Sequence, residues 1–254
     1  MKAGLDTMQG SSDAVRCITE GILTNKIPER QSHKSKVRTT LKQSFRGSYG
    51  HVFSVDIYDD RLKKKFDKIG KTTFAELIAY YLNESIYEEY QRLSPKAQAI
   101  IDGFGERSEN LTGQLRTSAL KNLHEVPTKF NYEVKIRFRQ SRDNQTILAK
   151  FNQDTATVLD AEESNEEVDL TVSITRLNIN TGNGRLLVEG ENDTVAFGFI
   201  GYRGIKLDAK KVFSENLDYN NGLPSEKWRH LKISATPIKL RDGKIIKYIV
   251  KGLY

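Results

Sequence analysis

Cysteine is nearly absent from this sequence of 254 residues, which contains one, Cys17. A single cysteine excludes a disulfide within the chain and is typical of proteins kept in a reducing compartment. Tryptophan also occurs once, as Trp228, and proline five times. We therefore expect a cytoplasmic protein whose fold depends on side-chain packing and not on cross-links.

Long apolar runs are missing as well. No stretch approaches the ~20 apolar residues that a membrane helix needs. Asp6, Asp13, Arg16 and Glu20 interrupt the first residues, so we expect no secretory signal there. A hydrophobic share of 37% with 29% charged residues favours a folded, soluble protein without a membrane partner.

Motifs for metals and phosphates are also lacking. The four histidines (His33, His51, His124 and His230) stand apart, and none has another His or Cys at metal-ligand spacing. The Gly-rich segment 181–185 precedes a predicted strand and not the helix that a phosphate loop needs, so it is interpreted as a turn. We therefore expect no metal ion and no cofactor, and we assign no catalytic residue.

Charge is spread unevenly along the chain, whose formal net charge is +7. Residues 26–71 contain thirteen Lys and Arg against five Asp and Glu, and residues 200–254 contain twelve against five. Residues 152–169 contain seven acids and no base. Such basic segments are typical of surfaces that bind nucleic-acid phosphates, although solvated surfaces and subunit contacts give the same pattern.

Helical spacing of apolar residues dominates the first half of the sequence. It predicts one helix over residues 13–23 and three further helices over 72–90, 94–104 and 108–123. Ser11 or Ser12 would cap the first helix, and Thr73 with Glu76 has the spacing of a capping box for the second. Pro127 would end the helical part.

Strand-like alternation predicts a hairpin over residues 37–58, with its corner at Arg46-Gly47-Ser48. Further short strands are predicted over 132–138, 146–151 and 156–159. From residue 168 onwards the pattern is mostly β, with a turn at Asn183-Gly184 and a short helix over 207–217. The predicted class is α+β: an N-terminal α/β part with a hairpin and three helices, and a small C-terminal β-barrel or sandwich.

Composition divides the chain into two expected domains. Residues 161–167 are acidic and lack large apolar side chains, which is typical of a linker or an exposed loop. We therefore expect an α+β domain over residues 1–160 and a small β-rich domain over residues 168–254.

Basic residues mixed with aromatic ones mark two candidate nucleic-acid-binding surfaces. The first is expected around the hairpin and comprises Arg46, Arg61, Lys63, Lys64 and Lys65. The second is expected on the closing strands and comprises Trp228, Arg229, Lys232 and Lys247. Lys and Arg would hold phosphates while the aromatic ring stacks on bases. The single tryptophan could equally be a packing residue.

One enzymatic alternative rests on Glu133-Val134-Lys135, because metal-dependent nucleases often place an acid and a lysine two residues apart on one strand. Glu125 or Asp102 could supply a further acid for a magnesium site. Glu-x-Lys is frequent in charged proteins, however, and Arg137 and Arg139 continue the same polar face. A solvated strand face is the simpler interpretation.

Turn sequences carry a resemblance to a known group. Phe45-Arg46-Gly47-Ser48-Tyr49 and the segment 177–186, together with the closing turn Asp242-Gly243-Lys244, resemble an uncharacterised prokaryotic family. Its genes often lie in mobile-element or phage-defence regions. The resemblance covers most of the chain and implies a bacterial protein with a role in antiviral defence. It transfers no catalytic residue.

These observations favour a non-enzymatic accessory protein that binds nucleic acid or a partner protein through its basic surfaces. A metal-dependent nuclease that uses Mg²⁺ is the first alternative. The second is a structural subunit, or a homo-oligomer, in which the acidic segment docks on a basic partner.

Overall fold

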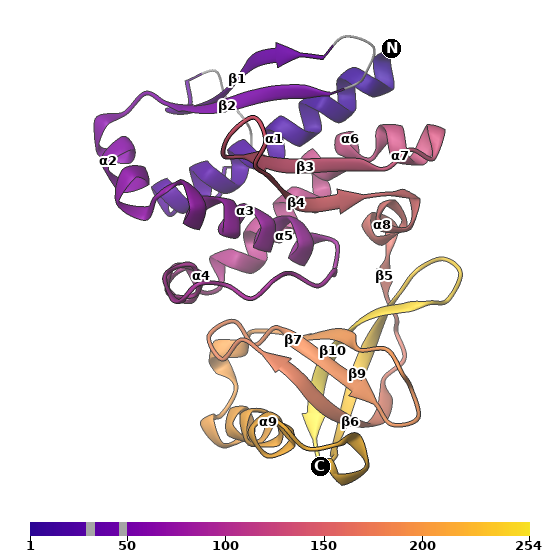
Figure 1. The fold of residues 1–254 in the computed structure, drawn as a ribbon. Helices are drawn as coiled ribbons and strands as arrows, with labels where there is room; N and C mark the ends of the chain where they lie inside the picture. Colours follow the sequence, from indigo (N-terminus) through magenta and orange to yellow (C-terminus); the bar gives the residue numbers. More distant parts are fainter. Residues whose placement is uncertain (29–33, 46–49) are drawn as a thin grey trace. The chain divides into compact units, whose positions relative to one another are not determined.

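The computed structural model describes residues 1–28, 34–45 and 50–254. It divides into two units, Met1–Leu159 and Asp160–Tyr254, each with its own hydrophobic core (Figure 1). The first unit combines helices with two hairpins and the second contains a β-barrel, so the predicted α+β class is confirmed. The predicted hairpin corner at Arg46-Gly47-Ser48 lies outside the described residues.

The first unit is mainly helical. Its helices are α1 (Lys2–Thr24), α2 (Asp60–Ile69), α3 (Lys71–Ser85), α4 (Pro95–Phe104), α5 (Arg107–Thr117), α6 (Ala119–Leu123), α7 (Glu125–Phe130) and α8 (Gln153–Thr157). Its strands form two antiparallel hairpins, β1 (Val37–Ser44) with β2 (His51–Ile57) and β3 (Val134–Arg139) with β4 (Gln145–Phe151).

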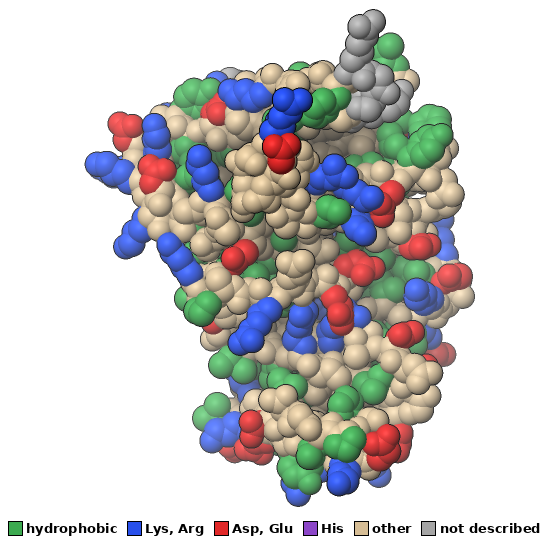
Figure 2. Space-filling model, in the orientation of Figure 1, with side chains coloured by type: hydrophobic (Ala, Val, Ile, Leu, Met, Phe, Trp, Pro, Cys, Tyr) green, Lys and Arg blue, Asp and Glu red, His purple; other side chains and the backbone are tan. Residues whose placement is uncertain are grey.

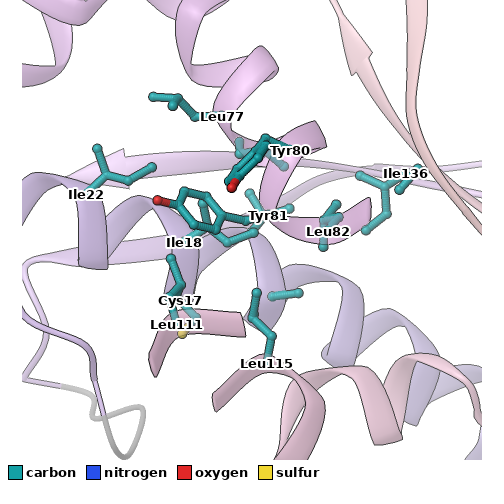
Figure 3. Packing of buried hydrophobic residues seen from close by; sticks show 14 of the residues in the cluster. Cys17, Ile18, Ile22, Leu77, Tyr80, Tyr81, Leu82, Leu111, Leu115 and Ile136 are labelled. Atoms are coloured by element: carbon teal, nitrogen blue, oxygen red, sulfur yellow. The ribbon is translucent and has the colours of Figure 1, made fainter. Parts of the chain in front are cut away.

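Helix α1 organises the core of this unit, because it contacts α3, α5, α6, α7 and the β1–β2 hairpin. Figure 3 shows this cluster, to which α1 contributes Ile18 and Ile22 and α3 contributes Tyr80 and Tyr81. Gly10 permits the close approach of α1 to α6: a Cβ there would lie 2.4 Å from the backbone nitrogen of Leu123. A side chain at this position would push the two helices apart.

Two predicted helix starts are wrong. Helix α1 begins at Lys2, and Ser11 and Ser12 lie inside it, where their hydroxyls donate to the carbonyls of the preceding turn. Helix α3 has Gly70 as its N-cap, without a side-chain hydrogen bond, so Thr73 and Glu76 form no capping box. The Glu76 carboxylate instead accepts hydrogen bonds from the N–H and the hydroxyl of the residue that caps α4.

Three further local predictions need correction. The predicted helix over 108–123 is divided at Ser118 into α5 and α6. Pro127 does not end the helical part but lies in the first turn of α7, where its missing N–H is tolerated. Residues 156–159, predicted as a strand, belong to α8 and a following 3₁₀ turn.

The second unit contains a closed barrel. Its strands are β6 (Val168–Leu177), β7 (Gly184–Val188), β8 (Val195–Phe199), β9 (Leu231–Lys239) and β10 (Ile245–Leu253). They pair in the order β6-β7-β8-β10-β9, and β9 pairs back to β6. Helix α9 (Leu207–Asn220) connects β8 to β9 and packs on β6. This Greek-key path is that of the oligonucleotide/oligosaccharide-binding barrel.

The acidic segment 161–167, expected as a linker or loop, contributes to the barrel. Its residues Glu162–Glu163 form the short strand β5, which pairs with the end of β9. The Glu163 carboxylate lies 3.2 Å from the Lys251 ammonium. Part of the acidic segment therefore meets basic residues of the same unit.

A buried hydrogen-bond network fixes α9 to the barrel. Strand β6 has an irregularity between Ile174 and Arg176, and the Asn216 amide oxygen accepts the Ile174 N–H there at 2.8 Å. The Asn216 amide nitrogen donates to the carbonyl of Arg229 at 2.9 Å. Asn220 donates to the same carbonyl. Both asparagines are buried, so these bonds satisfy groups that water cannot reach.

Candidate nucleic-acid interface

The first predicted basic cluster lies mostly on a helix and not in a loop. The Asp59 carboxylate accepts the N–H groups of Arg61 and Leu62 and so fixes the start of α2. Leu62, Phe66 and Ile69 pack against the core of the first unit. The remaining sides of α2 face outward and carry its charged residues other than Lys65.

Three cations share one outward side of α2. Arg61, Lys64 and Lys68 stand at positions i, i+3 and i+7 and are all exposed. Among the described residues no carboxylate lies within ion-pair distance of any of them. Lys63 is exposed on a neighbouring side of the helix. Figure 2 shows Lys and Arg side chains projecting at the edge of the view where α2 lies in Figure 1.

Lys65, predicted to bind phosphate, faces inward. Its ammonium donates to the carbonyls of Ile22 at 2.8 Å and Leu23 at 2.9 Å, in the last turn of α1. A cation at this end of a helix compensates the partial negative charge of the free carbonyls. Burial is the main cause that lowers the pKa of Lys65 from its ordinary value, and the charge of Arg107 adds to it.

Other cations of the first unit bind helix ends in the same way. The Lys96 ammonium donates to the carbonyl of Lys68 at the end of α2, at 2.8 Å. The Arg116 guanidinium donates to the carbonyl of Ser85 at the end of α3, at 2.7 Å. Arg107 donates to the last carbonyls of its neighbour α4. Several of the positive charges counted in the sequence therefore stabilise helix ends within the first unit.

The residues of the second predicted cluster lie at different positions in the second unit. Trp228 and Arg229 lie between α9 and β9. The Trp228 indole N–H donates to the carbonyl of Leu223 at 2.9 Å, and the Arg229 guanidinium lies 3.6 Å from the ring centre of Tyr219. Both side chains thus have partners within the unit, which favours a structural role for Trp228.

Lys232 and Lys247 lie far apart on the barrel. Lys232 stands near the start of β9, opposite Thr171, whereas Lys247 on β10 stands opposite Ile238. Six positions along β9 separate these two pairings, or about 20 Å at ~3.3 Å per residue. The structure therefore does not unite Lys247 with Trp228, Arg229 and Lys232. Arg46 lies outside the described residues.

Two arginines that the sequence analysis missed share the barrel surface with Lys247. Arg176 on β6 is directly opposite Arg185 on β7. Ala196 on β8 is the partner of both Arg185 and Lys247, on its two sides. The three cations therefore lie in one row across four neighbouring strands. The irregularity in β6 sets this register, and no simple sequence pattern reports it.

The acids of the nuclease alternative form ion pairs or hydrogen bonds with nearby side chains. The Glu133 carboxylate lies 2.6 Å from the Lys135 ammonium, and the two side chains are 38% and 34% exposed. This hydrogen bond lowers the pKa of Glu133. Glu125 pairs with Lys129, and the Asp102 carboxylate accepts a hydrogen bond from Gln98. Among the described residues, no three His, Cys, Asp or Glu side chains are grouped so that they could hold a metal ion.

A cleft of about 580 Å³ lies in the first unit between α3 and β4. Small residues, Ala75, Ala79 and Ala149, contribute to its lining. Four acids, Glu76, Glu88, Glu89 and Glu133, and two bases, Arg92 and Lys150, line it, and its geometry assigns it no reaction.

No protein-family model, no curated protein and no solved structure matches this chain. Within the part of the chain that the structure describes, no helix is long and apolar enough to cross a membrane. The ligand of this chain must therefore be inferred from its own side chains.

Proposed function

We propose that this chain is a nucleic-acid-binding accessory protein whose α2 cations hold phosphates without regard to base sequence. The observation that carries the proposal is the row formed by Arg61, Lys64 and Lys68. These like charges lie on one helix side, exposed, with no carboxylate at ion-pair distance among the described residues.

Like charges three and four residues apart destabilise a helix by repulsion. A polyanion placed along α2 would relieve this repulsion and release its own counterions, which is the main source of sequence-independent affinity for nucleic acids. The row from Arg61 to Lys68 spans ~10 Å along the helix axis, at 1.5 Å per residue. That length suits contacts with more than one phosphate of a single backbone.

The apolar side of α2 supports a polyanion over an apolar partner. Leu62, Phe66 and Ile69 are packed against the core, so the exposed surface of the helix is charged and not apolar. A partner protein would have to present an acidic face.

The proposal places the protein in the bacterial cytoplasm, where buried Cys17 would stay reduced, and in the defence setting that the family resemblance implies.

The test replaces the three cations with neutral residues in the full chain: Arg61→Gln, Lys64→Gln and Lys68→Gln. Binding to single-stranded and duplex DNA and RNA is measured by fluorescence anisotropy from ~50 mM salt upwards. We expect weaker binding and a plot of log K against log salt that flattens by about 2 to 3 units, at ~0.7–0.9 for each phosphate that is no longer bound.

A matched control removes the same charge elsewhere, at exposed Lys121, Lys211 and Lys227. It should bind nearly as wild type does. Equally weakened binding in the two triple variants would mean that only net charge matters, and absence of wild-type binding at ~50 mM salt would reject the proposal. Incubation of the nucleic acids with wild-type protein and Mg²⁺ tests the nuclease alternative. Cleavage by wild type that disappears in Glu133→Gln would show that the protein is a nuclease.

A further inference from the structure

The β3–β4 hairpin is a ribbon of two strands with one packed side and one free side. Ile136 and Ala149, which are partners across the two strands, lie buried in the core of the first unit. Side chains alternate along a strand, so Lys135, Arg137 and Arg139 of β3 project from the opposite side, into solvent. Among the described residues no third strand pairs with this hairpin. The ribbon therefore has the width of two strands.

The free end of this ribbon projects from the core. All residues from 139 to 147 are exposed, and they include the turn and the adjoining ends of both strands. On the inner side, Phe138 and Thr146 line the cleft beside α3 instead of packing in the core. The turn, residues 140–144, contains one Arg and one Asp and is therefore neutral. This half of the ribbon can meet a large ligand without displacing packed side chains.

Charge on the polar side is compensated near the core and not toward the free end. Lys135 and Lys150 are partners across the strands, and both act on the Glu133 carboxylate, which lies 2.6 Å from the Lys135 ammonium. Arg137 and Arg139 are exposed, and among the described residues no carboxylate lies within ion-pair distance of either. Figure 2 shows Lys and Arg side chains gathered where β3 and β4 lie in Figure 1. The ribbon therefore has a surplus of positive charge toward its free end.

The residue types of this surface suit the edges of paired bases. Residues 139–147 contain no aromatic side chain on which an unpaired base could stack. Arginine carries a planar fork of donors that binds the O6 and N7 acceptors of guanine together in the major groove of a duplex. Ile147, the cross-strand partner of Arg137, is 41% exposed and offers an apolar contact for a thymine methyl group. The polar side of the ribbon therefore favours a duplex over a single strand.

The dimensions of the ribbon match the major groove of B-form DNA. Alternate residues of a strand are ~6.7 Å apart, and base pairs are ~3.4 Å apart along the helix axis. Arg137 and Arg139 are therefore spaced like bases two steps apart. Two strands ~4.8 Å apart fit a groove ~12 Å wide, which admits a two-stranded ribbon. The major groove of duplex RNA is too narrow for side chains to read.

We infer that the free end of the β3–β4 ribbon enters the major groove of double-stranded DNA, where Arg137 and Arg139 bind guanines two base pairs apart. The inference rests on the proposed function for its ligand class and adds that the ligand is a DNA duplex. The cations of α2 hold backbone phosphates while the ribbon contacts base edges, which is the usual division between contacts that position a protein and contacts that specify sequence. Both elements belong to the first unit.

The experiment uses the full chain and a DNA duplex in which one strand alternates guanine and adenine, so that guanines recur every two base pairs. The same duplex with 7-deazaguanine lacks the N7 acceptor but keeps its base pairs. Wild type should bind the unmodified duplex about 5- to 150-fold tighter, which is the range for one bidentate contact. It should also prefer this duplex to an RNA duplex of the same sequence and to either DNA strand alone. Arg137→Ala with Arg139→Ala should abolish the difference between the two DNA duplexes.

The matched control, Arg92→Ala with Arg241→Ala, removes the same charge at exposed positions elsewhere and should keep the preference for the unmodified duplex. Circular dichroism of each variant verifies the fold. Equal binding of wild type to the two DNA duplexes, tighter binding to RNA or to a single strand, or a preference that persists in the ribbon variant would each overturn the inference. A salt dependence that the α2 variant still flattens would then keep the proposed function. A preference for the unmodified duplex without any effect of the α2 variant would keep the ribbon site alone.

Discussion

Three consecutive lysines of α2 differ in what their side chains contact. Lys63 and Lys64 are exposed, whereas Lys65 donates to two carbonyls at the end of α1. Successive residues on a helix point about 100° apart, so neighbours of identical chemistry meet different surroundings. A run of like residues in a sequence therefore need not form one binding surface.

This difference predicts opposite outcomes for two identical substitutions. Lys65→Gln should lower the free energy of unfolding by about 1–2 kcal/mol, because it removes charge-assisted hydrogen bonds and a favourable charge at a helix end. Lys64→Gln should leave stability within about 0.5 kcal/mol of wild type. Urea unfolding followed by circular dichroism measures both. Equal stability of the two variants would contradict the capping role of Lys65.

At the scale of single elements, α9 is held on the barrel by buried polar contacts in addition to the packing of Phe213 in the barrel core. Asn216→Ala would leave the N–H of Ile174 buried without a partner, because β6 pairs with β9 only as far as Val172. The expected cost is ~1–3 kcal/mol. Thermal unfolding of the purified variant measures the decrease in stability.

Glu215→Ala is the matched control for this prediction, since Glu215 is the exposed neighbour of Asn216 on α9. Its unfolding free energy should stay within about 0.5 kcal/mol of wild type. If the two variants unfold alike, the hydrogen bond to Ile174 does not hold the helix on the barrel.

The ends of some helices and strands could be predicted from the sequence, whereas the ends of others could not. Ser94 and Pro95 start α4 as their chemistry indicates. The first turns of α1 escaped prediction because small residues make its contact with α6, and Gly10 is required there by a backbone contact. Helix α2 escaped because its apolar side is short and lies between charged residues.

The candidate sites show the same limit. The density of positive charge alone indicated Arg61 and Lys64 of the α2 row, but it also included Lys63, which lies on a neighbouring side of the helix, and it did not single out Lys68. The arginines that meet across β6 and β7 could not be predicted, because their pairing depends on the strand register that follows the irregularity in β6. Local patterns report which residues are present, whereas register and helix rotation decide which of them meet.

On the scale of the molecule, the second unit has the properties of a domain that folds alone. All five barrel strands and α9 come from Asp160–Tyr254, and the ring of pairings is closed within this range. Fragment 160–254 should therefore show a cooperative thermal transition, followed by Trp228 fluorescence. Fragment 160–244 is the control, because it lacks β10 and opens the barrel. A non-cooperative transition in the longer fragment would contradict independent folding.

The cations that cap helix ends in the first unit act across long stretches of chain. Lys65, Lys96 and Arg116 reach carbonyls 43, 28 and 31 residues earlier in the sequence. The last turns of α1, α2 and α3 therefore gain these partners only after later segments have docked. During synthesis α1 would emerge with a frayed end and become ordered when α2 arrives. The helices of this unit should accordingly form and melt together, since each depends on a neighbour to complete it.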